Sequence, residues 1–248
     1  MYRFFVEPYQ ILDNKISVEG SDFNHIKNVL RMKIGEEVSV AVSGDDKEYR
    51  CGIEAYEEGR VILTVRFIKE NNVELPCKIT ILQCLPKADK MELIIQKAVE
   101  LGVYEIIPVA SKRAVVKLDE KKAASKVSRW NTVSETAAKQ AKRAIIPEVH
   151  MPLNVDKALE YVKEADVKII PYELSDNDGM NETRKIFDSI KAGQSVVIFI
   201  GPEGGFEESE VNKAKEKGFL PVTLGKRILR TETAGITVLS WLVYLLEE

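Results

Sequence analysis

The stretch Ser195–Ala234 decides the fold, because it holds two apolar runs that each lead into a glycine-bearing loop. It reads Ser195-Val-Val-Ile-Phe-Ile200, Gly201-Pro-Glu-Gly-Gly205-Phe206, a charged segment, Phe219-Leu-Pro-Val-Thr-Leu224 and Gly225-Lys-Arg-Ile-Leu-Arg-Thr-Glu-Thr-Ala234. The uninterrupted run Val196–Ile200 is typical of a strand buried on both faces of a sheet. Such a strand, emptying into a glycine turn at a helix start, is where α/β sheets bind ligands.

The glycine spacing excludes two common nucleotide sites. Gly201, Gly204 and Gly205 do not fit G-x-G-x-x-G, and no Gly-Lys-Ser/Thr follows, so neither a dinucleotide fingerprint nor a P-loop is present. Glu207, Glu208 and Glu210 are expected to open a helix at its positive end. The loop from Leu224 to Arg230 also follows a strand, and we expect Thr231 as the N-cap of the next helix with Glu232 in its first turn.

The rest of the chain alternates strands and helices after residue 73. Alternation of this kind predicts a parallel sheet with right-handed crossovers. We expect strands at 78–85, 104–110, 167–171, 196–200 and 220–224, and helices at 88–101, 122–143, 181–190, 207–217 and 231–246. Residues 1–72 instead predict a small β-barrel-like domain with strands at 2–6, 15–18, 37–43, 48–56 and 60–68 and one helical patch at 22–30.

Composition describes an ordinary soluble globular protein, with 45% hydrophobic and 30% charged residues in 248. Three cysteines and two isolated histidines favour structural thiols in a reduced, cytoplasmic setting and no metal site. Neither terminus predicts a signal peptide or a membrane span. The net charge of −3 hides one basic region, since the segment from Ser111 to Arg143 contains ten Lys or Arg and three acidic residues.

These motifs together resemble a known family. Gly201-Pro-Glu-Gly-Gly-Phe206, followed by Leu224-Gly-x-x-Ile-Leu-Arg-x-Glu-Thr-Ala234, resembles the RsmE family of ribosomal RNA methyltransferases, which belongs to the SPOUT class. The resemblance implies a trefoil-knotted methyltransferase domain at 73–248 and a PUA-like RNA-binding β-barrel at 1–72. It also implies S-adenosylmethionine as cofactor. Thr136 and Thr231 stand where alanines are usual.

The resemblance implies which residues form the cofactor site. Glycines allow the backbone to approach a ligand closely, and the 224–229 backbone suits the adenine edge. The residues assigned to cofactor binding are Ile200, Gly201, Gly205, Leu224, Gly225, Ile228 and Leu229, with Leu174 as a further lining residue.

The expected nucleophile is N3 of a uridine, whose proton must be removed or whose anion must be stabilised. Arg230 is the candidate stabiliser; the alternative is an ion pair with Glu232 or Glu203. Glu203 is the candidate base or base-orienting group if burial raises its pKa, and the alternative is a carboxylate that stabilises the turn by accepting backbone N–H bonds.

Two regions are expected to contact RNA through phosphates or bases. The candidates are Arg3, His25 and Arg31 in the N-terminal domain and Arg113, Arg129, Gln140 and Arg143 in the basic region. The alternatives are solvated side chains for Arg3 and Arg31, a satisfied histidine at the edge of the core for His25, and a solvated face for the basic region.

The last helix is apolar around most of its circumference, which predicts burial on all sides, within the chain or in a homodimer through the C-terminal domain. The resemblance implies methylation of N3 of a uridine in small-subunit ribosomal RNA, with ribosomal RNA or the small ribosomal subunit as partner. Two other functions stay open: another SPOUT methylation, such as ribose 2′-O-methylation, and a non-catalytic RNA-binding assembly factor.

Overall fold

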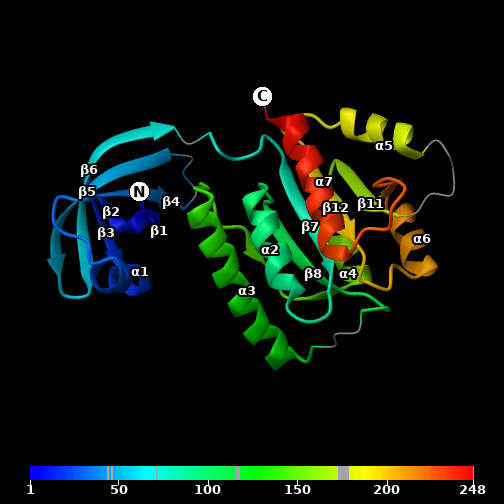
Figure 1. The fold of residues 1–248 in the computed structure, drawn as a ribbon, viewed down its shortest axis with the longest axis horizontal. Coiled ribbons are helices and arrows are strands. Elements are labelled where there is room, and N and C mark those ends of the chain that lie inside the picture. The colour runs from blue at the N-terminus through cyan, green and yellow to red at the C-terminus, as the bar shows by residue number, and fades with distance from the viewer. Residues whose placement is uncertain (44, 46, 71, 115–117, 173–178, 248) are drawn as a thin grey trace. The chain divides into compact units, whose positions relative to one another are not determined.

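The computed structural model describes residues 1–43, 45, 47–70, 72–114, 118–172 and 179–247 (Figure 1). The chain forms two compact units. One contains Met1–Glu74 together with Ala138–Ile146, and the other contains Leu75–Ala137 together with Pro147–Glu248. The segment 138–146 therefore belongs with the N-terminal residues, although it follows them by more than sixty positions along the chain.

A six-stranded sheet forms the N-terminal unit, in the order β1-β4-β5-β6-β3-β2. Its pairs are antiparallel except for β1 with β4. The strands are β1 (Arg3–Val6), β2 (Ile11–Leu12), β3 (Lys15–Glu19), β4 (Glu37–Val42), β5 (Lys47–Glu57) and β6 (Arg60–Glu70). All five predicted strands are present; β2 and a 3-10 turn, η1 (Pro8–Gln10), were not predicted. The predicted helical patch is a short helix, α1 (Gly20–Asn24), continued by a π-helical turn, η2 (His25–Val29).

A seven-stranded sheet forms the C-terminal unit, and every pair in it is parallel, which confirms the predicted α/β class. Its order is β10-β8-β7-β12-β11-β13, with β9 beside β8. The strands are β7 (Lys78–Cys84), β8 (Glu105–Ala110), β9 (Glu148–Val149), β10 (Leu153–Asn154), β11 (Val167–Pro171), β12 (Ser195–Ile200) and β13 (Leu220–Val222). The trefoil knot that the resemblance implies stays a prediction.

The helices between these strands lie where the sequence placed them, with one exception. They are α2 (Lys90–Glu100), α3 (Glu120–Gln140), α4 (Val155–Tyr161), α5 (Gly179–Asp188), α6 (Glu208–Glu216) and α7 (Thr231–Leu246). Helix α4 was not predicted, although its signals are local: Asn154 accepts a hydrogen bond from Lys157 N at 2.9 Å as the N-cap, and Val155, Ala158 and Leu159 are buried.

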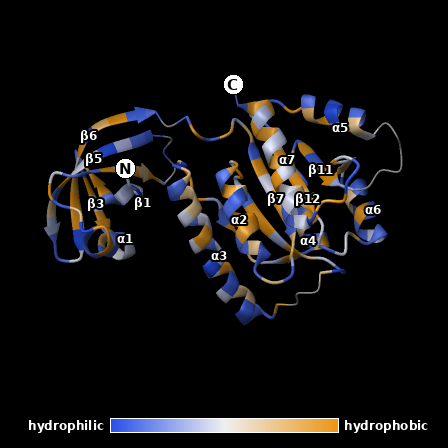
Figure 2. Cartoon of the chain, in the orientation of Figure 1, coloured by the Kyte–Doolittle hydropathy of each residue, from blue (hydrophilic) through white to orange (hydrophobic). Residues whose placement is uncertain are grey.

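The core of the C-terminal unit lies around β12, as its continuous apolar run predicts. Val196 through Ile200 are buried, and the Phe199 ring contacts the rings of Phe206 and Phe219 at centroid distances of 4.6 and 6.0 Å. Figure 2 shows hydrophobic residues along these central strands and on α2 and α7.

The three cysteines are buried and free, and burial raises the pKa of Cys51 and Cys84 to about 12, in keeping with structural thiols.

Helix α7 is not buried on all sides within the chain. It packs against α2, β12 and α5 through a face that includes Val238, Leu239 and Leu242. Tyr244 is 85% exposed and Leu245 is also exposed. The predicted burial within the single chain is therefore wrong on this face, and the dimer interface stays a prediction. No helix in the described part of the chain is long and apolar enough to cross a membrane.

Candidate active site

A pocket of about 520 Å³ lies where the two glycine-bearing loops meet. Strands β12 and β13 both run parallel to β11, which lies between them, so their carboxyl ends reach the same edge of the sheet. Ligands of open α/β sheets bind at this edge. The pocket is lined by Arg113, Pro171, Tyr172, Ile200, Gly201, Pro202, Glu203, Gly205, Phe206, Val222, Thr223, Leu224, Gly225, Lys226, Arg227, Ile228, Leu229, Arg230, Thr231 and Ala234.

The first loop is a tight turn between β12 and α6. Gly205 has φ +69° and donates its backbone N–H to Pro202 O at 2.9 Å. A Cβ on Gly201 would lie 3.0 Å from the Phe206 ring, so the chain needs glycine there for close packing. Glu207 and Glu210 then form a reciprocal capping box that starts α6.

The second loop follows β13 and leads into α7. Gly225 has φ +106°, a conformation that L side chains rarely adopt. Ile228 is 93% exposed in this pocket wall, which is unusual for an isoleucine. The predicted cofactor residues that the structure brings together in the pocket are Ile200, Gly201, Gly205, Leu224, Gly225, Ile228 and Leu229. Leu174 lies outside the described residues.

The N-cap of α7 is Arg230, not Thr231 as predicted. Thr231 is the first helical residue and is buried. Its hydroxyl donates to Gly201 O at 2.6 Å and accepts from Gln83 Nε2 at 2.9 Å. The hydroxyl therefore bonds two neighbouring strands instead of capping its own helix.

Glu203 does not have the raised pKa that the base role requires. Burial alone would raise the pKa of its carboxyl, but hydrogen bonds from its own backbone N–H, from Lys90 and from Lys87 N outweigh burial and lower it. Glu203 Oε1 lies 3.0 Å from Lys90 Nζ and 3.1 Å from Lys87 N. The structure thus corrects the candidate base to a carboxylate that stabilises the turn.

Arg230 is left available for a ligand. Both carboxylates named as its alternative partners are taken by Lys90, which lies 3.0 Å from Glu203 Oε1 and 3.4 Å from Glu232 Oε2. Among the described residues the Arg230 guanidinium makes no ion pair and no side-chain hydrogen bond, and the residue is exposed at the pocket. The predicted alternative for Arg230, an ion pair with Glu203 or Glu232, is therefore wrong.

Lys90 and Arg113 lie beside the glycine turn and make contacts that the sequence did not predict. Lys90, at the start of α2, joins the glycine turn to the first turn of α7. Arg113, predicted to bind RNA, lines the pocket and bonds the turn through Gly204 O at 3.2 Å and Glu207 Oε1 at 3.3 Å. These contacts join residues 91 to 142 positions apart, and no local pattern encodes them.

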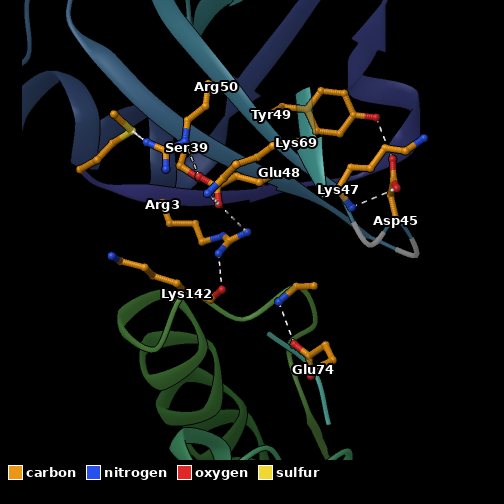
Figure 3. A network of polar contacts seen from close by, with 12 residues as sticks. Arg3, Ser39, Asp45, Lys47, Glu48, Tyr49, Arg50, Lys69, Glu74 and Lys142 are labelled. Atoms are coloured by element: carbon orange, nitrogen blue, oxygen red, sulfur yellow. Dashed lines mark hydrogen bonds and ion pairs between the residues drawn. The ribbon is translucent and has the colours of Figure 1, made fainter. Parts of the chain in front are cut away.

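Two predicted RNA contacts, Arg3 and Arg143, are instead buried structural groups of the N-terminal unit. The Arg3 side chain is 2% exposed; it donates to Lys142 O and lies 3.9 Å from the Glu48 carboxylate (Figure 3). Arg143 is also buried and pairs with Glu74. Because both guanidinium groups are turned into the protein, the predicted direct contact of Arg3 and Arg143 with RNA is corrected to fastening of the segment 138–146.

The other predicted RNA residues are accessible. His25 and Arg31 are exposed at η2 and just after it, and Arg31 has φ +52°. Gln140 is exposed at the end of α3. Arg129 is exposed too, with its Nε 2.7 Å from Glu92 Oε1.

Within the described residues no group of three or more His, Cys, Asp or Glu side chains is placed to hold a metal ion.

A parallel α/β sheet with a glycine-lined pocket at its carboxyl edge defines a class of proteins that bind a nucleotide-like ligand. The RNA methyltransferase domain model matches residues 73–243, and the RNA methyltransferase PUA domain model matches residues 18–66. The chain belongs to the ribosomal RNA small subunit methyltransferase E family, on the relatives that follow.

Three relatives show the extent of the likeness. The chain is 38% identical to ribosomal RNA small subunit methyltransferase E of Bacillus subtilis, over 98% of this chain and 96% of the relative. It is 36% identical to the protein of that name from Mesomycoplasma hyopneumoniae, over 97% and 98%. The crystal structure of the Neisseria gonorrhoeae protein bound to S-adenosyl methionine superposes with a TM-score of 0.84 at 31% identity, over 99% and 98%. The predicted enzyme class, an S-adenosylmethionine-dependent RNA methyltransferase, is confirmed.

Proposed function

We propose that this protein transfers the methyl group of S-adenosylmethionine to N3 of a uridine in small-subunit ribosomal RNA. The observation that carries the proposal is the convergence of both glycine-bearing loops and Arg230 on one pocket. The solved relative with S-adenosyl methionine and the family membership support the donor and the ribosomal substrate.

The residues of the pocket fit the cofactor. Apart from the adjoining residues, a Cβ on Gly205 or Gly225 would meet no atom of the described chain within 4 Å, so both glycines leave open space beside the backbone for a bound molecule. Ile200, Ile228 and Leu229 supply apolar surface for an adenine, and the exposed Ile228 gains cover when a ring packs on it. S-adenosylmethionine, when bound, supplies a methyl group activated by a sulfonium.

Arg230 is the catalytic residue for which the arrangement argues best. Loss of the N3 proton places negative charge on the uracil oxygens, and a guanidinium stabilises such charge through several donors in one plane. Lys90 pairs with both Glu203 and Glu232, and in the described part of the chain neither carboxylate forms an ion pair with this guanidinium. Glu203, already ionised, shapes the glycine turn while Arg230 faces the acceptor base.

RNA is held by accessible groups of both units. His25 and Arg31 act in the PUA-like domain, residues 1–72, and Arg129 acts from α3 in the knotted SPOUT domain, residues 73–248. Gln140 acts from the end of α3, which belongs to the N-terminal unit. Arg113 stands at the pocket and so contacts both the glycine turn and the nearby nucleotide.

The protein works in the cytoplasm as a homodimer whose interface includes the exposed end of α7, where Tyr244 and Leu245 lie.

Calorimetric titration with S-adenosylmethionine tests the pocket. Gly205→Ala should weaken binding at least tenfold, because the added methyl group enters the open space beside the loop. Gly193→Ala is the matched control: Gly193 also has a positive φ, +88°, and open space, but it does not line the pocket. Equal affinities of the two variants would refute the assignment.

A further inference from the structure

A buried chain of hydrogen bonds lies directly behind the pocket. Gln83, near the end of β7, is 0% exposed, and its Nε2 donates to Cys84 O at 3.0 Å and to Thr231 Oγ1 at 2.9 Å. The Thr231 hydroxyl in turn donates to Gly201 O at 2.6 Å. Two strands and the first residue of α7 are thus joined by one hydroxyl.

The direction of this chain is fixed. Both amide hydrogens of Gln83 are used, so a reversed amide would set its oxygen against the Cys84 carbonyl oxygen. The Thr231 hydroxyl must accept from Gln83, which leaves its single hydrogen for Gly201 O. Gln83 Oε1 is buried and accepts no hydrogen bond from the described residues. The Gln83 side chain is therefore oriented by the two hydrogen bonds that its amide N–H groups donate, although this orientation leaves its acceptor oxygen unpaired.

The end of the chain, Gly201, forms part of the pocket wall and is confined from two sides. The Phe206 ring lies 3.0 Å from the position of a Cβ on Gly201, and the Thr231 hydroxyl holds its carbonyl. Thr231 also lines the pocket. Confinement of a glycine peptide matters because glycine otherwise has the widest choice of backbone conformations.

We infer that Thr231 and Gln83 are positioning residues for the cofactor site. Gln83 orients the Thr231 hydroxyl, and the hydroxyl sets the Gly201 peptide, which fixes both the glycine turn and the start of α7 beside Arg230. This inference rests on the proposed function, since it names how the chain preorganises the pocket for S-adenosylmethionine. Preorganisation spares the ligand the cost of ordering the loop.

Variants that keep shape and change hydrogen bonding test this inference. Thr231→Val keeps the volume and removes the hydroxyl, while Thr231→Ser keeps the hydroxyl. Thr231→Val should weaken S-adenosylmethionine roughly tenfold, as expected for a lost buried hydrogen bond, and Thr231→Ser should stay within about threefold of the unchanged protein. Gln83→Met should weaken binding several-fold, and adding it to Thr231→Val should cause no further loss, because both act through one hydroxyl.

Hydrogen exchange without ligand supplies a second readout. Thr231→Val should speed backbone exchange at 201–206 and 231–234, and leave β7 and β8 unchanged. Equal affinities and exchange rates for the valine, serine and unchanged proteins would overturn the inference, as would an equal loss in valine and serine variants. Failure of the unchanged protein to bind S-adenosylmethionine would instead refute the proposed function, and the exchange data would still decide the positioning role.

Discussion

Arg230 is the residue whose chemistry distinguishes catalysis from binding. Arg230→Ala should lower kcat by about 100-fold or more, the usual cost of removing one donor to a developing anion, while cofactor affinity changes less than threefold. Single-turnover kinetics and calorimetry measure the two quantities. Arg184→Ala, an exposed arginine on α5, is the control and should leave both unchanged. Matching losses in affinity and turnover would remove Arg230 from the catalytic role.

For Glu203 we expect the opposite of Arg230, namely that its replacement has little effect on catalysis. Its folded pKa is lowered by the hydrogen bonds that outweigh burial, so the carboxylate is already ionised well below neutral pH. Glu203→Gln should therefore leave the acid limb of the kcat/KM profile in place and reduce turnover by less than about tenfold. Loss of the acid limb with a fall of about 100-fold or more would restore Glu203 as the general base.

The placement of the candidate site residues was predicted well where the motif is local and poorly where contacts are distant. The seven described residues assigned to cofactor binding come from two loops whose glycines the sequence shows directly, and all seven line one pocket. Arg3 and Arg143 were misassigned because a sequence gives their charge and not their burial beside Glu48 and Glu74. Threonine favours N-cap positions, so the sequence predicts Thr231 as the N-cap, but its hydroxyl instead forms tertiary hydrogen bonds with Gln83 and Gly201.

At the scale of elements, the end of α2 depends on a glycine. Gly102 has φ +85°, and a Cβ there would lie 2.6 Å from Leu75 Cδ1. Gly102→Ala should lower the free energy of unfolding by about 2–4 kcal/mol, the sum of backbone strain and overpacking. Gly193→Ala shares the strain without the clash and should cost about 1–2 kcal/mol. Urea unfolding compares the two, and equal costs would contradict the packing argument.

The His150–Glu105 pair makes the edge of the parallel sheet sensitive to pH. His150 Nε2 lies 2.8 Å from Glu105 Oε2, and Thr80 and Tyr161 also donate to this carboxylate. The hydrogen bond to Glu105 raises the pKa of His150. Burial would raise the pKa of Glu105, but its hydrogen bonds lower it.

The pair should therefore stabilise the fold most between the ordinary pKa values of 4.5 and 6.5. Its contribution falls as pH rises through the raised pKa of His150, and falls again as pH drops through the lowered pKa of Glu105. Unfolding measured from pH 4 to 9 should show this decline above about 6.5 in the unchanged protein and lose it in His150→Gln. An identical pH dependence in both proteins would contradict the assignment.

Elements with a regular pattern were predicted closely, and short ones were missed. Helix α7 and strand β11 have the predicted bounds, since their apolar runs are long and well bounded. Strands β9 and β10 contain two residues each, too few for a periodic pattern, and α4 is a helix of seven residues. The exposed face of α7 could not be predicted, because an all-apolar helix does not indicate whether its own chain or another covers it.

At the scale of the whole molecule, the exposed end of α7 predicts a dimer. Replacing Tyr244 and Leu245 together by Glu should convert a dimer to monomers in sedimentation equilibrium, because two charges would have to be buried in the apolar interface. Replacing Tyr9 and Leu12 by Glu is the control, since both are at least 75% exposed in the N-terminal unit and should not affect association. A monomeric unchanged protein would contradict the proposal.

Nucleoside mass analysis after reaction tests whether the protein methylates N3 of a uridine. Small ribosomal subunits, and separately their naked RNA, are incubated with the protein and isotope-labelled S-adenosylmethionine, and the RNA is digested to nucleosides. We expect labelled 3-methyluridine with the unchanged protein and a strongly reduced yield with Arg230→Ala. Label on a ribose 2′-oxygen, or no labelled nucleoside from either substrate while the cofactor binds, would contradict this expectation.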